Sequence, residues 1–145
     1  MFSQDFKEFI ELLNKNKVEY LVVGGYAVGF HGYPRYTGDI DVWIKADNKN
    51  AEKMVSVLNE FGFGSSNIKK ENFLKLDNII QLGNPPFRID IIMYIDGVTF
   101  DECYENRTCT MIDQFEINFI GYNELIKNKK ASGRDKDLLD LKNLK

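Results

Sequence analysis

The chain has 145 residues, of which 43% are hydrophobic and 28% charged, and its formal net charge is −3. This length predicts one domain spanning residues 1–145, because it supplies one hydrophobic core but not two independent ones. The mildly acidic total charge excludes general electrostatic attraction to nucleic acid or anionic membranes. A polyanionic ligand would therefore have to be held by local cations or by a metal ion.

The sequence shows no membrane or secretion signal. No apolar run approaches the roughly 18 residues of a membrane span, and the opening residues MFSQDFKEF lack the apolar stretch of a signal peptide. Cys103 and Cys109 are not spaced like a redox or zinc motif, which favours reduced thiols. We therefore expect a cytoplasmic protein with no membrane partner, and the single histidine argues against a zinc cage.

In the first half of the chain, helices alternate with two short strands. In chain order the pattern predicts a helix over 3–16, a strand over 20–23, a short helix over 26–30, a strand over 38–44 and a helix from about 48 to 61. Ser3 is a suitable N-cap for the first helix, and Asn48 or Asn50 for the last. Gly24-Gly25 forms the turn between the first strand and the short helix.

The second half is richer in strands and ends in helices. The predicted elements are one or two short strands between 72 and 82, a strand over 87–95, a hairpin of 108–112 and 115–120, and helices over 122–131 and 134–144. In the strand over 87–95, Phe87 is expected on the same face as Ile89 and Ile91. This order predicts an α+β fold, in which helices pack against a mixed β-sheet and the C-terminal tail is helical.

Three carboxylates are candidates for a metal site. Asp39 and Asp41 lie one residue apart on a predicted strand, so their side chains point to the same side. They either form part of a magnesium site or belong to the polar face of an amphipathic strand. Asp90 lies in a largely apolar strand, where an unpaired carboxylate is costly. It either pairs with Arg88 or joins the other two acids in a cluster suited to two-metal catalysis.

The segment from Gly24 to Thr37 contains candidate phosphate contacts. Gly24-Gly25 either presents backbone N–H groups to a phosphate at a helix N-terminus or is only a turn. Arg35 contacts a triphosphate, balances the carboxylates, or is a solvated surface arginine. His31 is expected to pack or to bond within the loop rather than to act as a ligand or base.

The tail segment KNKKASGRDKD concentrates basic side chains, namely Lys127, Lys129, Lys130, Arg134 and Lys136. These side chains either form the polar face of two surface helices or make a positive wall for nucleotide phosphates or an RNA end. Asp137 and Asp140 are predicted to belong to the surface pattern of the last helix and not to a metal site.

Taken together, these motifs resemble the nucleotidyltransferase superfamily typified by DNA polymerase β. The resemblance lies in Gly24-Gly25, thirteen intervening residues, Asp39-Ile40-Asp41 and the later strand acid Asp90. The longer string GGYAVGFHGYPRYTGDIDVWI and the ending LIKNKKASGRDKDLLDLKNL look closer to the small bacterial minimal nucleotidyltransferases of the AbiEii-toxin-like group. The resemblance covers most of the chain and implies a mixed sheet of the nucleotidyltransferase type.

The resemblance implies transfer of a nucleoside monophosphate from a nucleoside triphosphate, with ATP among the candidate donors, to a hydroxyl. The acceptor would be an RNA end, such as that of a tRNA, or a protein, in a toxin–antitoxin or defence setting with a cognate partner protein. Asp39, Asp41 and Asp90 would be the catalytic residues and would bind two Mg²⁺ ions, or Mn²⁺ in their place. The alternative is a non-catalytic nucleotide-binding or regulatory module that retains the fold.

The resemblance also implies a set of nucleotide-binding residues, which are Gly24, Gly25, Arg35, Thr37, Lys130 and Arg134. The two glycines would hold the triphosphate, and the tail residues Lys130 and Arg134 would contact nucleotide or acceptor. The chain departs from the superfamily at Gly25, where many active members have a serine. This difference removes one side-chain hydroxyl from the phosphate site.

Overall fold

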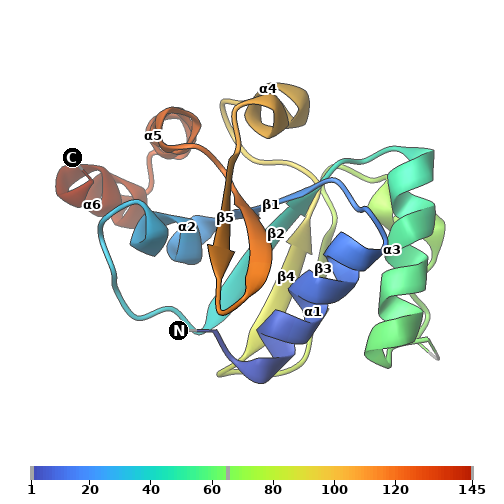
Figure 1. Cartoon of the computed structure of the whole chain (residues 1–145). Helices are drawn as coiled ribbons and strands as arrows, with labels where there is room; N and C mark the ends of the chain where they lie inside the picture. Colours follow the sequence, from blue (N-terminus) through green and yellow to red (C-terminus); the bar gives the residue numbers. More distant parts are fainter. Residues whose placement is uncertain (1, 65, 145) are drawn as a thin grey trace.

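A computed structural model describes residues 2–64 and 66–144, and it confirms the predicted α+β class (Figure 1). Six strands form one mixed sheet in the order β3-β4-β2-β1-β6-β5. The strands are β1 (Tyr20–Val23), β2 (Asp39–Ile44), β3 (Ile79–Leu82), β4 (Arg88–Ile92), β5 (Thr108–Ile112) and β6 (Phe115–Phe119). The helices are α1 (Gln4–Lys15), α2 (Gly24–Phe30), α3 (Asn48–Phe61), the 3-10 turn η1 (Lys70–Phe73), α4 (Phe100–Glu105), α5 (Tyr122–Ser132) and α6 (Asp135–Asn143).

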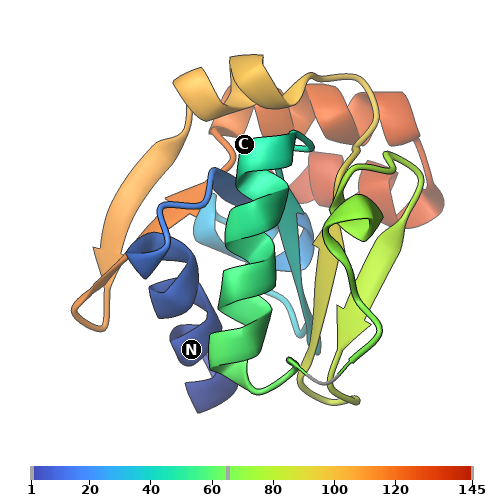
Figure 2. The same ribbon diagram turned by 90° about the vertical axis from the view of Figure 1, so that its right-hand side faces the viewer.

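The helices cover the two faces of the sheet unequally. In Figure 1, α1 and α3 lie on one side of the sheet, and α2, α5 and α6 lie on the other. In Figure 2 α3 stands in front, with α1 beside it and the C-terminal helices behind the sheet. The α1 side holds fully buried apolar residues such as Phe6, Phe9 and Leu13. As predicted, Ser3 caps α1, since its Oγ accepts a hydrogen bond of 3.2 Å from the backbone N–H of Phe6.

The central strand pairs fix which side chains share a face. β1 and β2 are antiparallel, whereas β2 and β4 are parallel neighbours. Along β2, Ile40, Val42 and Ile44 are fully buried, while the alternate residues Asp39 and Asp41 are only partly covered. The predicted alternation is therefore confirmed, and the two acids lie on the face opposite the Ile40 side of the strand.

The start of α3 differs from the prediction. Neither Asn48 nor Asn50 caps this helix, because Asp47 Oδ1 accepts the 2.8 Å hydrogen bond from the backbone N–H of Asn50. The Asn50 side chain is buried and bonds elsewhere. Its Oδ1 accepts from the Glu19 N–H at 2.8 Å, and its Nδ2 donates to the carbonyl oxygens of Glu19 at 3.0 Å and Lys45 at 2.9 Å.

The segment 72–82 forms one strand, β3, within the prediction of one or two. Two other segments depart from the prediction. The strand predicted over 87–95 begins at Arg88, and Phe87 is 55% exposed, whereas Ile89 and Ile91, expected on the same face, are buried. The helix α4 was not predicted, although Thr99 and Glu102 form a capping box that the sequence displays as T-x-x-E.

The hairpin and the tail agree with the prediction. β5 and β6 are antiparallel and turn at Asp113 and Gln114, both of which have positive φ. α5 ends at Ser132, and the C-cap residue Gly133 has a φ of +59°. The predicted break near Ser132-Gly133 is therefore confirmed. No helix in the described part of the chain is long and apolar enough to cross a bilayer.

Replacing Asn50 with alanine should lower the free energy of unfolding by about 1–3 kcal/mol, because it removes the hydrogen bonds of a buried amide and takes this partner from the Glu19 N–H and the Lys45 carbonyl oxygen. The exposed neighbour Asn48 is a matched control, whose replacement by alanine should change stability by less than about 0.5 kcal/mol. Urea unfolding of both variants measures the difference. Equal stability of the two variants would contradict the role given to Asn50.

Candidate active site

The parallel pairing of β2 and β4 assembles the predicted acids. In this register Asp39 lies opposite Arg88, and Asp41 lies opposite Asp90. Residues directly opposite each other on neighbouring strands point to the same face of a sheet. Asp39, Asp41 and Asp90, called here the acidic row, therefore share one face, as the sequence predicted.

Arg88 forms ion pairs with two members of the acidic row. Its Nε donates to Asp90 Oδ1 at 2.7 Å, and its Nη2 donates to Asp90 Oδ2 at 3.0 Å. The same Nη2 donates to Asp39 Oδ2 at 2.7 Å. The ion pair weighed as an alternative for Asp90 is therefore present, and it extends to Asp39. Such charge-assisted, bidentate contacts are among the stronger hydrogen bonds in proteins.

The Asp41 carboxylate differs from those of Asp39 and Asp90 in its partners. Within the described residues it forms no ion pair or hydrogen bond, whereas the other two pair with Arg88. Burial and, next, the Asp90 carboxylate raise the pKa of Asp41 from 3.8 to about 6. Gly24 lies directly over Asp41, has a φ of +66°, and any side chain placed there would collide with the Asp41 carboxylate. Only glycine fits at this position.

Gly25 and Thr37 share one small space beside the acidic row. A Cβ atom added at Gly25 would lie 2.9 Å from Thr37 Oγ1 and 3.0 Å from Thr37 Cβ. The Thr37 hydroxyl itself donates to the backbone oxygen of Asp39 at 3.2 Å. A serine at position 25 would therefore require Thr37 to move. The threonine brings a hydroxyl next to the glycine turn, which has no hydroxyl of its own.

The other loop residues singled out from the sequence bond to the rest of the protein. Arg35 is held by Asp140, with Nε and Nη2 donating to the two carboxylate oxygens at 3.0 Å each. Arg35 is thus neither a solvated surface arginine nor paired with the acidic row. His31 lies within the loop as expected, with its Nε2 2.7 Å from the carbonyl oxygen of Ile120.

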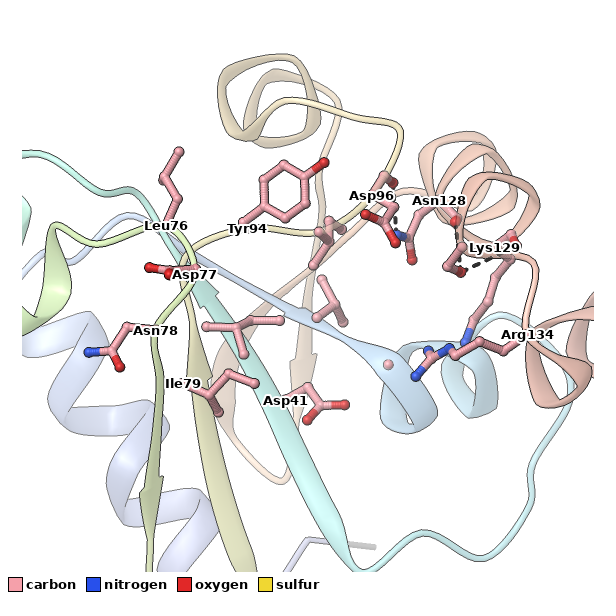
Figure 3. A pocket seen from close by; sticks show the side chains of 15 residues that line it. Asp41, Leu76, Asp77, Asn78, Ile79, Tyr94, Asp96, Asn128, Lys129 and Arg134 are labelled. Carbon is pink, nitrogen blue, oxygen red and sulfur yellow. Dashed lines mark hydrogen bonds between the residues drawn. The ribbon is translucent and has the colours of Figure 1, made fainter.

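A cleft of about 440 Å³ opens beside Asp41 and Gly24 and is called here the Asp41 cleft (Figure 3). One wall comes from α5 and the turn after it, and the other from the segments before β3 and after β4. The first wall includes Asn128, Lys129 and Arg134, and the second includes Leu76, Ile79, Tyr94 and Asp96. The cleft therefore joins Asp41, the one member of the acidic row among its lining residues, to cations on one side and to apolar side chains on the other.

The tail residues are more buried than the sequence suggested. Asp137 and Asp140 are 0% and 1% exposed, so the prediction that they belong to a surface pattern is wrong. Lys129 is also buried and lies 3.0 Å from a carboxylate oxygen of each. Arg134 Nε donates to Asp137 at 2.7 Å while its side chain lines the Asp41 cleft. Lys130 is exposed and is not among the residues that line the cleft.

The electrostatics of Asp137 follow from these contacts. Burial alone would raise the pKa of this carboxyl, but hydrogen bonds from Arg134, Ser132 and Lys129 hold it well below its usual range. The same holds for Asp140, whose pKa is lowered by Arg35 and Lys129 in spite of burial. Both carboxylates are therefore charged at neutral pH, and each pairs with Lys129 beside the cleft.

The acidic row has the chemistry of a divalent-cation site. Within residues 2–64 and 66–144, no three acidic, histidine or cysteine side chains are positioned to hold a metal ion together. Asp39 and Asp90 instead face the Arg88 guanidinium. Carboxylate oxygens are nevertheless the ligands that Mg²⁺ and Mn²⁺ prefer. The donor atoms of Asp39, Asp41 and Asp90 therefore suit such an ion in kind, and an ion there would have to displace the Arg88 guanidinium from Asp39 and Asp90.

Comparison with known families agrees with this geometry. The model of a family described as "Nucleotidyltransferase of unknown function (DUF6036)" matches residues 3–145. The chain belongs to this nucleotidyltransferase family. The predicted resemblance to the superfamily is thereby confirmed, whereas the closer likeness to AbiEii-type proteins stays a prediction. A comparison with curated proteins found no significant match.

Solved structures similar to this nucleotidyltransferase share its fold. A candidate nucleotidyltransferase from Thermotoga maritima superposes with a TM-score of 0.65 at 14% identity, covering 94% of this chain and 88% of the other. A lincosamide antibiotic adenylyltransferase with lincomycin bound gives 0.59 at 14% identity, covering 99% and 96%. A nucleotidyltransferase-like antigen of Paracoccidioides brasiliensis gives 0.55 at 14% identity, covering 97% and 72%.

The raised pKa of Asp41 predicts how stability depends on pH. Because the folded state holds this proton more tightly than the unfolded chain, the charged carboxylate costs stability as pH rises from about 4 to about 6, and the cost persists above that range. Asp41→Asn should therefore raise the free energy of unfolding near pH 8 by up to about 2–3 kcal/mol and give little gain near pH 4. Urea unfolding at both pH values measures this. An equal effect at both would contradict it.

The position of Arg88 predicts how metal binding responds to its removal. Without the guanidinium, the acidic row carries uncompensated charge, so Arg88→Gln should let Mn²⁺ raise the melting temperature more than it does in the unmodified protein. Arg107→Gln is the matched control, since Arg107 stacks on Tyr104 away from the acidic row. A Mn²⁺-induced shift that is the same in all three proteins would count against Arg88 as the displaced cation.

Proposed function

We propose that this protein is a metal-dependent nucleotidyltransferase that moves a nucleoside monophosphate from a nucleoside triphosphate to a hydroxyl group. The main support is the register of β2 and β4, which sets Asp41 opposite Asp90 beneath the Gly24 turn. The adjoining cleft adds the cations of Lys129 and Arg134. Family membership supports the reaction class, whereas the roles of the individual site residues are proposed from their positions.

The reaction would depend on positioning and charge neutralisation, without a covalent nucleophile on the protein. The acceptor oxygen attacks the α-phosphorus, and the bond from that phosphorus to the oxygen bridging to the β-phosphate breaks. Pyrophosphate leaves with the electron pair of that bond, and the acceptor proton passes to the Asp90 carboxylate. Divalent ions bound at Asp39, Asp41 and Asp90 would neutralise charge on the phosphates.

The remaining predicted residues take roles that suit their positions. Gly24 and Gly25 allow a triphosphate to approach the backbone closely, and Arg134 supplies a cation inside the cleft. Thr37 brings a hydroxyl next to Gly25, and Arg35 positions that loop through its ion pair with Asp140. Lys130 would contact an acceptor outside the cleft.

We further propose that the acceptor hydroxyl belongs to an RNA end, such as that of a tRNA, or to a protein, in a toxin–antitoxin or defence setting with a cognate partner. The basic residues Lys130 and Lys136 support an RNA acceptor, because both are exposed on the helices that border the cleft. The fold shared with an antibiotic adenylyltransferase makes a small hydroxyl compound the third acceptor class to test.

One observation favours a second function, that of a non-catalytic nucleotide-binding or regulatory module. Arg88 neutralises Asp39 and Asp90, the acids that a catalytic ion would need. If the guanidinium stays in place when nucleotide binds, the protein would retain the nucleotide without transferring it. The two functions therefore differ in whether Arg88 leaves the acidic row.

The test is to incubate the protein with each α-labelled triphosphate, Mg²⁺ or Mn²⁺, and tRNA, cell extract or small hydroxyl compounds. Label should appear on an acceptor, and Asp41→Asn and Asp90→Asn should reduce transfer by about 100-fold or more. Asp113→Asn is the control, since it makes the same charge change at the β5–β6 turn, where Asp113 pairs with Lys7. It should leave transfer unchanged.

Each other outcome separates the two functions. Triphosphate that binds in the presence of Mg²⁺ but is transferred to none of the acceptors would favour the regulatory module. Transfer that survives Asp41→Asn would contradict the proposed site. Since Asp41→Asn is expected to stabilise the folded protein at neutral pH, loss of transfer in this variant could not be attributed to unfolding.

A further inference from the structure

The Asp41 cleft has two chemically different ends (Figure 3). At one end Asp41 lies close to the cationic side chains of Lys129 and Arg134, which suits a triphosphate and its metal ions. At the other end, away from Asp41, Tyr94, Asp96 and Asn128 lie together. A ligand bound along this cleft would place an anionic group at the first end and a different group at the second.

The wall formed by the segments before β3 and after β4 carries an apolar surface. Leu76, Ile79 and Tyr94 line the same wall and are 57%, 58% and 54% exposed. Large apolar side chains that remain exposed together in a cleft mark a binding surface. An exposed aromatic ring beside aliphatic side chains suits a planar base, and stacking of this kind contributes about 1–3 kcal/mol per base.

The polar groups beside this surface mainly accept hydrogen bonds. The Asp96 carboxylate can only accept when ionised, and it forms no ion pair within the described chain, although its charge is one of the causes that raise the pKa of Arg134. Asn128 donates one N–H of its amide to the Asp96 carbonyl oxygen at 2.9 Å, which leaves its own Oδ1 as an acceptor. Asp77 also lines the cleft, but it lies beside Leu76 and Asn78, away from Asp96 and Asn128.

We propose that this end of the cleft binds the base of the donor nucleotide and selects guanine through its exocyclic amine. Asp96 is the residue that accepts from that amine, and Tyr94 stacks on the ring. Guanine carries this amine at C2, whereas hypoxanthine and uracil carry none and adenine carries its amine at C6, on a different edge of the ring. This inference rests on the proposed function, because it takes the triphosphate to lie at Asp41.

Calorimetric titration with ATP, GTP, ITP and UTP in the presence of Mg²⁺ tests the selection. GTP and ITP form a matched pair, since they differ only in the exocyclic amine. GTP should bind about tenfold or more tightly than ATP, ITP and UTP, as expected for loss of a hydrogen bond to a charged group. Asp96→Asn should abolish the difference between GTP and ITP.

Two further variants separate selection from general effects. Tyr94→Ser should weaken all four nucleotides and keep their order, because stacking does not depend on the amine. Asp135→Asn makes the same charge change as Asp96→Asn at an exposed residue outside the cleft lining, and it should leave affinities and order unchanged.

Equal binding of all four nucleotides, or a preference for GTP over ITP that survives Asp96→Asn, would overturn the inference and leave the proposed function standing. If none of the four nucleotides binds, the proposed function fails and this inference fails with it.

Discussion

The parallel pairing of β2 with β4 is the constraint on which the site depends. Neighbouring strands lie about 4.8 Å apart, so the acidic row concentrates three carboxylates on one small part of the sheet. Like charges at this spacing must be compensated. The protein does so in two ways, by ion pairs from Arg88 to Asp39 and Asp90 and by the raised pKa of Asp41. A divalent cation bound at the acidic row would compensate the same charges in place of Arg88 and of the proton on Asp41.

The wall of the cleft that contains Lys129 and Arg134 is held by buried charge. Lys129 joins Asp137 to Asp140, and Asp140 in turn fixes Arg35 in the loop before β2. This network ties α5 and α6 to the loop that carries Thr37. Breaking one member would leave a buried charge unpaired, which is strongly destabilising. The basic tail is therefore part of the framework of the site, and Arg134 is the member best placed to reach a ligand.

Local patterns in the sequence predicted much of the fold and the acidic row. Helical spacing located α1, and alternation along β2 placed Asp39 and Asp41 on one face. Contacts between distant segments escaped prediction. The reach of Arg88 to Asp39 depends on the register of β2 and β4, and the burial of Asp140 depends on Arg35. No local periodicity encodes either contact.

The central claim is that Arg88 occupies the place of a catalytic cation and leaves it when nucleotide binds. A crystal structure with Mg²⁺ and a triphosphate analogue that cannot be cleaved between its α and β positions tests this most directly. The account predicts that Mg²⁺ is bound by Asp39 and Asp41, and that the contacts of Arg88 with Asp39 and Asp90 are broken. A nucleotide bound while Arg88 still bridges those two carboxylates, with no ion on the acidic row, would contradict it.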